Sequence, residues 1–130
     1  MKKHHLLICF LFSFLGIHQS FAQSNKGRCQ VEVVSADSKG GFGYCGTSVV
    51  FKNNGNKTID GITYQIYFYN KFDELLGSRE NTWTDDGIGD DPIAPGKTER
   101  DSDSFKAFSD ASYITVTIKK VHYTDRTICN

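Results

Sequence analysis

Four aspartates and two glycines fall within seven residues of the segment TWTDDGIGDDPIAPGKTE, which runs from Thr82 to Glu99. Carboxylates in this density point to two kinds of chemistry. Calcium takes about six to eight oxygen ligands, and glycines let a loop wrap tightly around the ion. A glycosidase instead needs two carboxyl groups held rigidly about 5–10 Å apart. The candidate residues for calcium binding or for hydrolysis are Asp85, Asp86, Asp90 and Asp91.

A third interpretation of this segment, a solvated loop between two strands, is favoured over both. The aspartate spacing fits neither an EF-hand nor a glycine-rich β-roll repeat. Hydrolysis needs one carboxyl group with a raised pKa in a cleft, whereas aspartates in a glycine-bearing loop are expected to be ionised. Gly, Pro and Asp gather in loops for backbone reasons alone. We therefore expect no resident cofactor, with calcium as the one ion that a weak extracellular site could take.

Aromatic side chains form the second candidate site, made of Trp83, Tyr67 and Tyr69. A flat aromatic face can stack on a sugar ring or anchor a protein partner. The alternative is that these residues serve the fold, since a single tryptophan usually lies in a core and tyrosine is common in strands. His122 is the only histidine after residue 22, so the sequence offers no histidine cluster for a metal. Any Ser-His-Asp site would have to include it.

The first 22 residues have the pattern of a secretory signal peptide. A basic start precedes an apolar run from Leu6 to Gly16, and Ser20-Phe21-Ala22 supplies small residues before the expected cleavage. The remaining 108 residues, 23–130, suit one secreted or periplasmic domain. They hold thirteen basic and fifteen acidic residues, a net charge of −2, which argues against nucleic-acid binding. No later apolar stretch is long enough to span a membrane.

Three cysteines follow the signal peptide, and none forms a CxxC motif. Outside the cytosol we expect one disulfide and one remaining thiol. The pairing depends on the chain between Tyr113 and Tyr123. One long bulged strand brings Cys29 to Cys129, whereas a hairpin at Lys119-Lys120 brings Cys129 to Cys45. A hairpin there lacks the Gly, Asn or Asp that it needs, so Cys29–Cys129 is preferred. A Cys29–Cys45 bridge is least favoured because of their hairpin register.

Alternating apolar residues and β-branched residues predict strands throughout the mature chain. The expected strands are residues 30–35, 47–53, 62–70, 75–84, 97–105 and 113–118. Val121 and Tyr123 are out of phase with the last strand, which indicates a bulge or a short turn at the lysines. The segments 37–41 and 53–56 are expected to be turns. Shared phase predicts a core of Val49, Phe51, Ile62, Ile66, Phe68, Ile114, Val116 and Ile118. Six or seven short antiparallel strands are typical of an immunoglobulin-like β-sandwich.

The middle of the chain also resembles the FxLYD domain, a small immunoglobulin-like sandwich of exported bacterial proteins. The matching pieces are VFKNNG at 50–55, Ile59, Ile62, FYN at 68–70, LLG at 75–77 and IAPGKT at 93–98. Asn70 stands where the family usually has aspartate, and the cysteines are outside the family's pattern. The resemblance implies an extracellular module with a binding role and carries over no catalytic residue, since fold and function are separate questions.

Together these patterns predict an exported, non-catalytic binding module whose partner is a protein or a glycan outside the cytoplasm. A protein-binding or adhesion-type accessory role comes first. The alternative is a carbohydrate-binding module that uses Trp83 with Tyr67 or Tyr69, and the third hypothesis is a hydrolase that uses the Asp85–Asp91 loop.

Overall fold

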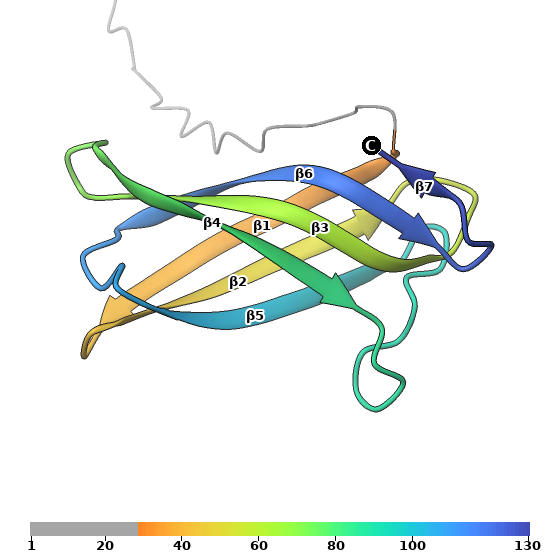
Figure 1. Ribbon diagram of the computed structural model, residues 1–130, viewed down its shortest axis with the longest axis horizontal. Helices are drawn as coiled ribbons and strands as arrows, with labels where there is room; N and C mark the ends of the chain where they lie inside the picture. The colour runs from red at the N-terminus through yellow and green to blue at the C-terminus, as the bar shows by residue number, and fades with distance from the viewer. Residues whose placement is uncertain (1–28) are drawn as a thin grey trace, which may run out of the picture.

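The computed structural model describes residues 29–130, so the expected signal peptide at 1–22 lies outside the described residues. Residues 29–130 contain no helix and form two antiparallel sheets packed face to face (Figure 1). The three-stranded sheet has the order β1 (Val31–Gly41), β2 (Tyr44–Asn53), β5 (Thr98–Lys106). The four-stranded sheet has the order β4 (Leu75–Thr84), β3 (Ile59–Tyr69), β6 (Tyr113–Tyr123), β7 (Ile128–Cys129). The expected immunoglobulin-like sandwich is confirmed, with seven strands.

The core lies between the sheets and follows from the alternation of β2, β3 and β6. On β3, the inward residues Ile62, Tyr64, Ile66 and Phe68 are fully buried, while the residues between them are half-buried on the outer face. Seven of the eight predicted core residues are buried, and Ile118 packs half-buried against them. Each large apolar side chain buried in this way contributes about 1.5–3 kcal/mol to folding.

The turn between β1 and β2 differs from the expected one. Residues 37–41 continue β1 and pair with β2 as far as Gly41, opposite Tyr44. The turn is instead Phe42-Gly43, with φ of 50° and 80°, as a two-residue type I′ hairpin requires. Gly40 has another role in the fold: a Cβ atom there would lie 2.1 Å from the carbonyl oxygen of Ser109. The glycine therefore lets the β5–β6 loop cross close to β1. Gly40 is needed for this close approach and not for a turn, so the glycines here lie within a strand.

Strand β6 runs unbroken from Tyr113 to Tyr123, as the bulged-strand alternative predicted. Its register against β3 shifts between the pairs Thr63↔Lys120 and Tyr64↔Ile118, so the bulge lies at the lysines. The extra residue changes the alternation phase, and Val121 after the bulge is buried like Ile114 and Val116 before it.

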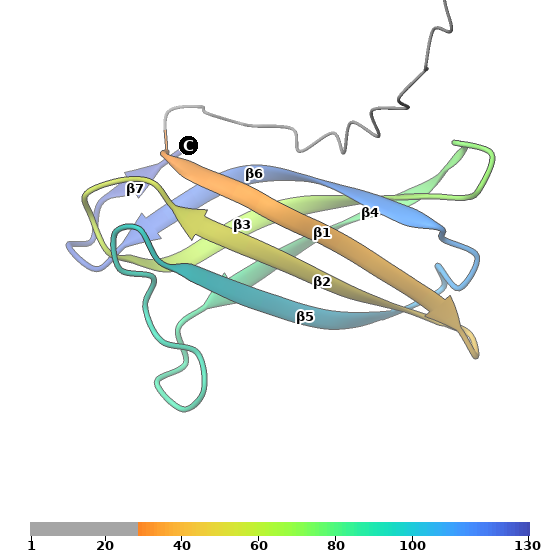
Figure 2. The same ribbon diagram turned by 180° about the vertical axis from the view of Figure 1, so that it is seen from behind.

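The connections between strands gather at the two ends of the sandwich, and the two views agree on this (Figures 1 and 2). The β1–β2, β3–β4 and β5–β6 connections lie at one end. The β2–β3, β4–β5 and β6–β7 connections lie at the other, beside Cys29 and the C-terminus. We call the second end the disulfide end. None of the residues described here forms a helix long and apolar enough to cross a membrane.

Candidate functional site

The aspartates of the β4–β5 loop hydrogen-bond to their own backbone. Asp86 Oδ1 accepts from the N–H groups of Ile88, Gly89 and Asp90 at 2.8, 3.0 and 3.3 Å, and these bonds hold the pKa of Asp86 below its ordinary value. Asp85 Oδ1 accepts from the Gly87 N–H at 2.8 Å. Across residues 29–130, no three acidic, histidine or cysteine side chains lie close enough to hold a metal ion. The carboxylates here shape the loop, as aspartate does in turns.

The three aromatic residues of the second candidate site are not on one surface. Trp83 is only 2% exposed, because it pairs with the inward residue Ile62 and so faces the core. Tyr67 and Tyr69 lie half-buried on the outer face of β3. The ring of Tyr69 stacks on that of Tyr113, with centroids 5.0 Å apart and planes 6° apart. The expected platform of Trp83 with Tyr67 or Tyr69 is therefore corrected, since strand alternation places the indole on the opposite face.

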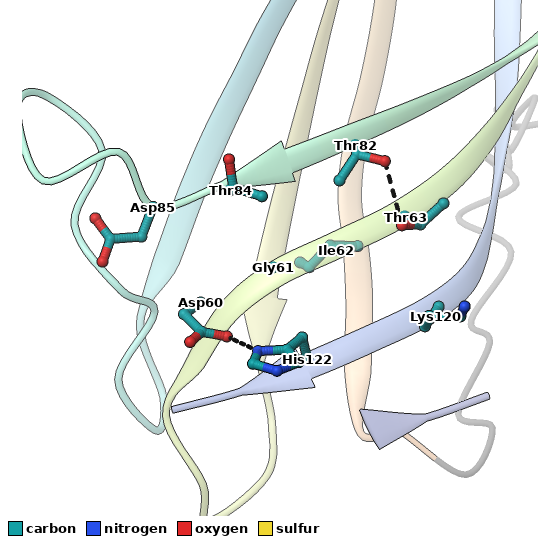
Figure 3. A pocket seen from close by; sticks show the side chains of 9 residues that line it. All are labelled: Asp60, Gly61, Ile62, Thr63, Thr82, Thr84, Asp85, Lys120 and His122. Carbon is teal, nitrogen blue, oxygen red and sulfur yellow. Dashed lines mark hydrogen bonds and ion pairs between the residues drawn. The ribbon is translucent and has the colours of Figure 1, made fainter. Parts of the chain in front are cut away.

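A polar pocket opens on the outer face of the four-stranded sheet near the disulfide end (Figure 3). We call it the Gly61 pocket. It encloses about 320 Å³, and its main polar lining is Asp60, Thr63, Thr82, Thr84, Lys120 and His122 around Gly61. Gly61 lies on the central strand, paired with Thr84 of β4 on one side and with His122 of β6 on the other. Gly61 is buried between these two neighbours and forms the floor of the pocket.

His122 is oriented by Asp60 within this pocket. The strand register shifts between Ile59 and Gly61, and such a bulge redirects the side chain at its centre. Asp60 Oδ1 lies 2.5 Å from His122 Nδ1 (Figure 3). A carboxylate accepts hydrogen bonds, so Nδ1 carries the proton and Nε2 stays free for another partner. The lining side chains beside this pair are mainly hydroxyl and charged groups that can hydrogen-bond to a ligand. No sequence pattern joins residues 60 and 122.

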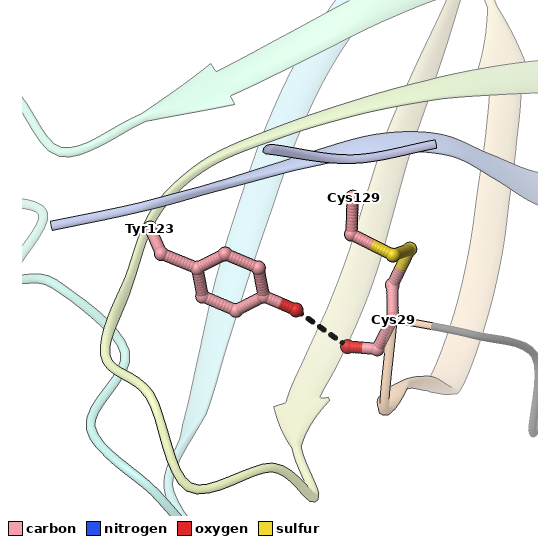
Figure 4. The surroundings of a disulfide bond; sticks show 3 residues. All are labelled: Cys29, Tyr123 and Cys129. Atoms are coloured by element: carbon pink, nitrogen blue, oxygen red, sulfur yellow. Dashed lines mark hydrogen bonds between the residues drawn. A yellow bond between two sulfur atoms is a disulfide. The ribbon is translucent and has the colours of Figure 1, made fainter. Parts of the chain in front are cut away.

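The disulfide end is held together by covalent and polar contacts. Cys29 and Cys129 form the preferred disulfide, with Cα atoms 5.6 Å apart, and Cys45 is a free buried thiol. The Tyr123 hydroxyl donates to the Cys29 carbonyl oxygen at 3.0 Å (Figure 4). Because structural disulfides form in oxidising compartments, this bond supports an extracytoplasmic location.

Asn53 connects the loops of the disulfide end from the inside. This fully buried amide donates from Nδ2 to the carbonyl oxygens of Lys57 and Ile93 at 2.7 and 2.8 Å. Its Oδ1 atom accepts from the Gly55 N–H at 2.9 Å. Outside it, the Lys57 ammonium contacts Asp125 at 2.8 Å, and this pair holds the pKa of Asp125 well below its ordinary value. Asn53 belongs to a segment expected to be a turn, which hid its role.

At the opposite end, large apolar side chains stand in solvent. The β1–β2 turn exposes Phe42 fully and Tyr44 by 49%, and the β3–β4 turn exposes Phe72 by 70% and Leu75 by 56%. We call this set, Phe42, Tyr44, Phe72 and Leu75, the aromatic end. No sequence pattern predicts a site at Phe42, Tyr44 or Phe72, and Leu75 enters only through the LLG piece of the FxLYD resemblance. The phenylalanine between two glycines in GFGY was a usable signal.

Comparison with family models and with curated proteins finds no match to this chain. Two solved structures are similar. A hypothetical protein from Peptoclostridium difficile 630 superposes with a TM-score of 0.58 and 11% sequence identity, over 80% of this chain and 87% of that one. A DUF1425 family member from Shewanella sp. pv-4 gives a TM-score of 0.46 and 11% identity, over 68% of this chain and 76% of that one. At this identity the first likeness shows the fold alone.

Proposed function

We propose that this protein is an exported, non-catalytic binding module that contacts a protein partner through the aromatic end. The observation that carries the proposal is Phe42. Its side chain is fully exposed, and its φ of 50° lies in a region that bulky residues rarely adopt. Such a backbone costs about 1–3 kcal/mol. An exposed ring gains nothing from burial in return, so a contact with a partner is the gain that accounts for it.

The β3–β4 turn, which carries Phe72, is held in a fixed conformation by hydrogen bonds. Asn70 Oδ1 accepts from the N–H groups of Phe72 and Glu74 at 2.9 and 3.1 Å. Asp73 takes φ of 63° and accepts from the Tyr113 hydroxyl at 3.0 Å. Loops ordered before binding lose little entropy on association, and exposed aromatic residues often supply most of the binding energy. The β3–β4 turn therefore presents Phe72 at low cost.

The location of the aromatic end supports the same function. Cys29 and the C-terminus lie together at the disulfide end, so the aromatic end is free of both (Figures 1 and 2). The expected signal peptide and the disulfide favour a secreted or periplasmic protein. The FxLYD resemblance adds an extracellular module with a binding role. In this chain the matching pieces at 53–55, at 70 and at 95–96 lie at strand ends and turns.

The test compares exposed apolar residues at the two ends. Wild type, Phe42→Asn, Phe72→Asn and the control Ile88→Asn are immobilised and incubated with the envelope and secreted fractions of the exporting cell. Ile88 is 93% exposed in the β4–β5 loop at the other end. Captured proteins are quantified by mass spectrometry. We expect Phe42→Asn and Phe72→Asn to lower capture of a specific partner about tenfold, the effect of losing about 1.4 kcal/mol. Equal loss in Ile88→Asn, or full capture by Phe42→Asn, would overturn the proposal.

A further inference from the structure

Gly61 is a glycine in the middle of a central strand, where it costs stability. A glycine there has no side chain to pack and commonly marks the close approach of a ligand or another backbone. At this position a Cβ atom would meet His122 Cβ at 3.4 Å and Thr84 Cγ2 at 3.8 Å, which are workable contacts. Gly61 is also absent from the residues with positive φ. Neither severe crowding nor backbone conformation therefore requires glycine, although Gly61 itself is buried, with the Trp83 carbonyl oxygen also 3.8 Å from the Cβ position. The glycine keeps the floor of the pocket low between Thr84 and His122.

The polar groups around the floor of the pocket alternate between donors and acceptors. Lys120 donates, and the carboxylates of Asp60 and Asp85 accept. The Thr63 and Thr82 hydroxyls lie 3.2 Å apart and can each do both. The carboxylates of Asp60 and Asp85 outnumber the Lys120 ammonium, which disfavours anions. The donors and acceptors of the lining favour a ligand whose own groups both donate and accept, and a cation is the alternative that the experiment must separate.

We propose that the Gly61 pocket binds one ring of a neutral saccharide. Sugar hydroxyls both donate and accept, which matches the lining. The volume of about 320 Å³ is at the lower end of ligand pockets, about 300–1,000 Å³, and suits a single ring. Thr84 and His122 flank the ring above the buried floor at Gly61, and Asp60 fixes the imidazole of His122 so that Nε2 meets a hydroxyl. This site lies near the disulfide end, away from the aromatic end. The protein would then bind a saccharide in addition to the proposed protein partner.

The first experiment follows the backbone amides of residues 60–63, 82–85 and 120–122 by NMR. The probes are glucose, galactose, mannose and N-acetylglucosamine, each titrated to tens of millimolar, with acetate as the anionic and methylammonium as the cationic probe. We expect saturable shifts at these amides with at least one of the four sugars and none with acetate or methylammonium. The proposal is overturned if no sugar shifts these amides saturably, or if the charged probes shift them equally.

The second experiment fills the pocket. Gly61→Val places a strand-favouring side chain over the floor, and Gly46→Val is the matched control in β2. A Cβ atom at Gly46 would meet only Lys39 and Asp103 carbonyl oxygens, at 3.7 and 4.0 Å. We expect Gly61→Val to weaken sugar binding at least about tenfold and Gly46→Val to leave it unchanged. Thr84→Val removes one hydroxyl without adding volume, and we expect weaker binding from it too. Unchanged affinity in Gly61→Val, or in Thr84→Val if Gly61→Val does not fold, overturns the proposal.

Discussion

At the disulfide end, a disulfide joins the residue before β1 to β7. A buried asparagine joins the β2–β3 and β4–β5 loops, and an exposed ion pair joins the β2–β3 and β6–β7 loops. At the aromatic end, two turns hold bulky rings in solvent. Phe42 and Asp73 have positive φ there, as Gln30 and Arg126 have at the disulfide end. The inside of the aromatic end is nevertheless closed. Phe108 of the β5–β6 loop stacks on Phe68 with centroids 4.1 Å apart, and the Arg79 guanidinium lies 5.0 Å from its ring. The packed rings of Phe68 and Phe108 thus support turns whose exposed rings contribute little to stability. The contacts that join the loops and chain ends lie at one end of the sandwich, and the exposed aromatic side chains lie at the other.

Removal of the disulfide should lower the free energy of unfolding more than any other change at either end. Cys29→Ser/Cys129→Ser opens a loop with a sequence separation of 100 residues, and the unfolded chain then regains up to about 4.7 kcal/mol of entropy. We expect the free energy of unfolding in urea to fall by about that amount. Reductant should destabilise wild type similarly and leave the double variant unchanged. A loss below about 1 kcal/mol would show that the other contacts suffice at this end.

The same truncation should cost much more at the buried ring of Phe68 than at the exposed ring of Phe72. Phe68→Ala removes a fully buried ring and should cost about 3–5 kcal/mol. Phe72→Ala removes a ring that is 70% exposed and should change the free energy of unfolding by less than about 0.5 kcal/mol. Both are measured by urea denaturation. Similar losses of unfolding free energy in the two variants would contradict this division between a buried and an exposed ring.

Adjacent asparagines at the disulfide end offer a third comparison. Asn53→Ala leaves the Lys57 and Ile93 carbonyls and the Gly55 N–H without this partner and should cost about 2–4 kcal/mol. Asn54 contributes one exposed side-chain bond, to Glu32 at 2.9 Å, so Asn54→Ala should cost less than about 1 kcal/mol. Thermal and urea unfolding give both values. Equal losses would mean that the amide of Asn53 does not organise the loops.

Phe42→Asn should raise stability while it removes the proposed contact. Asn-Gly is the preferred pair for a type I′ turn, since asparagine tolerates positive φ better than phenylalanine. Relief of the strain at φ of 50° should increase the free energy of unfolding by about 1 kcal/mol. The change is read from the melting temperature. A less stable variant would show that Phe42 serves the fold and would weaken its assignment to binding.

Calcium is expected to have the smallest effect. A site at about 100 times its dissociation constant would add about 2.7 kcal/mol, which calorimetry would detect readily in a chain of this size. Because the loop carboxylates bond to their own backbone, we expect no shift in melting temperature with millimolar calcium. A clear increase that disappears in Asp85→Asn/Asp90→Asn would restore the calcium site.

The sequence predicts the strands and the disulfide, because alternation and turn-forming residues determine them, and it predicts few of the contacts between strands. Strand β4 has its expected bounds, and the bulge in β6 led to the correct disulfide. Gly40-Gly41 was mistaken for a turn because the close approach of Ser109 involves a loop about 70 residues away. The Asp60–His122 contact joins residues 62 apart, and only the pairing of β3 with β6 creates it. Local patterns thus identify elements, while the contacts between them form the pocket.

The disulfide has a mechanical consequence. It joins the first described residue, Cys29, to the penultimate one, Cys129. A pulling force could be applied between the chain before Cys29 and the residue after Cys129. The sulfur–sulfur bond would bear this force, and the seven strands between the two cysteines would not. The hydrogen-bonded ladders between them would carry almost no load. Pulled in this way, the sandwich keeps its shape and its aromatic tips, whereas the reduced protein would have to resist the same force through its sheets.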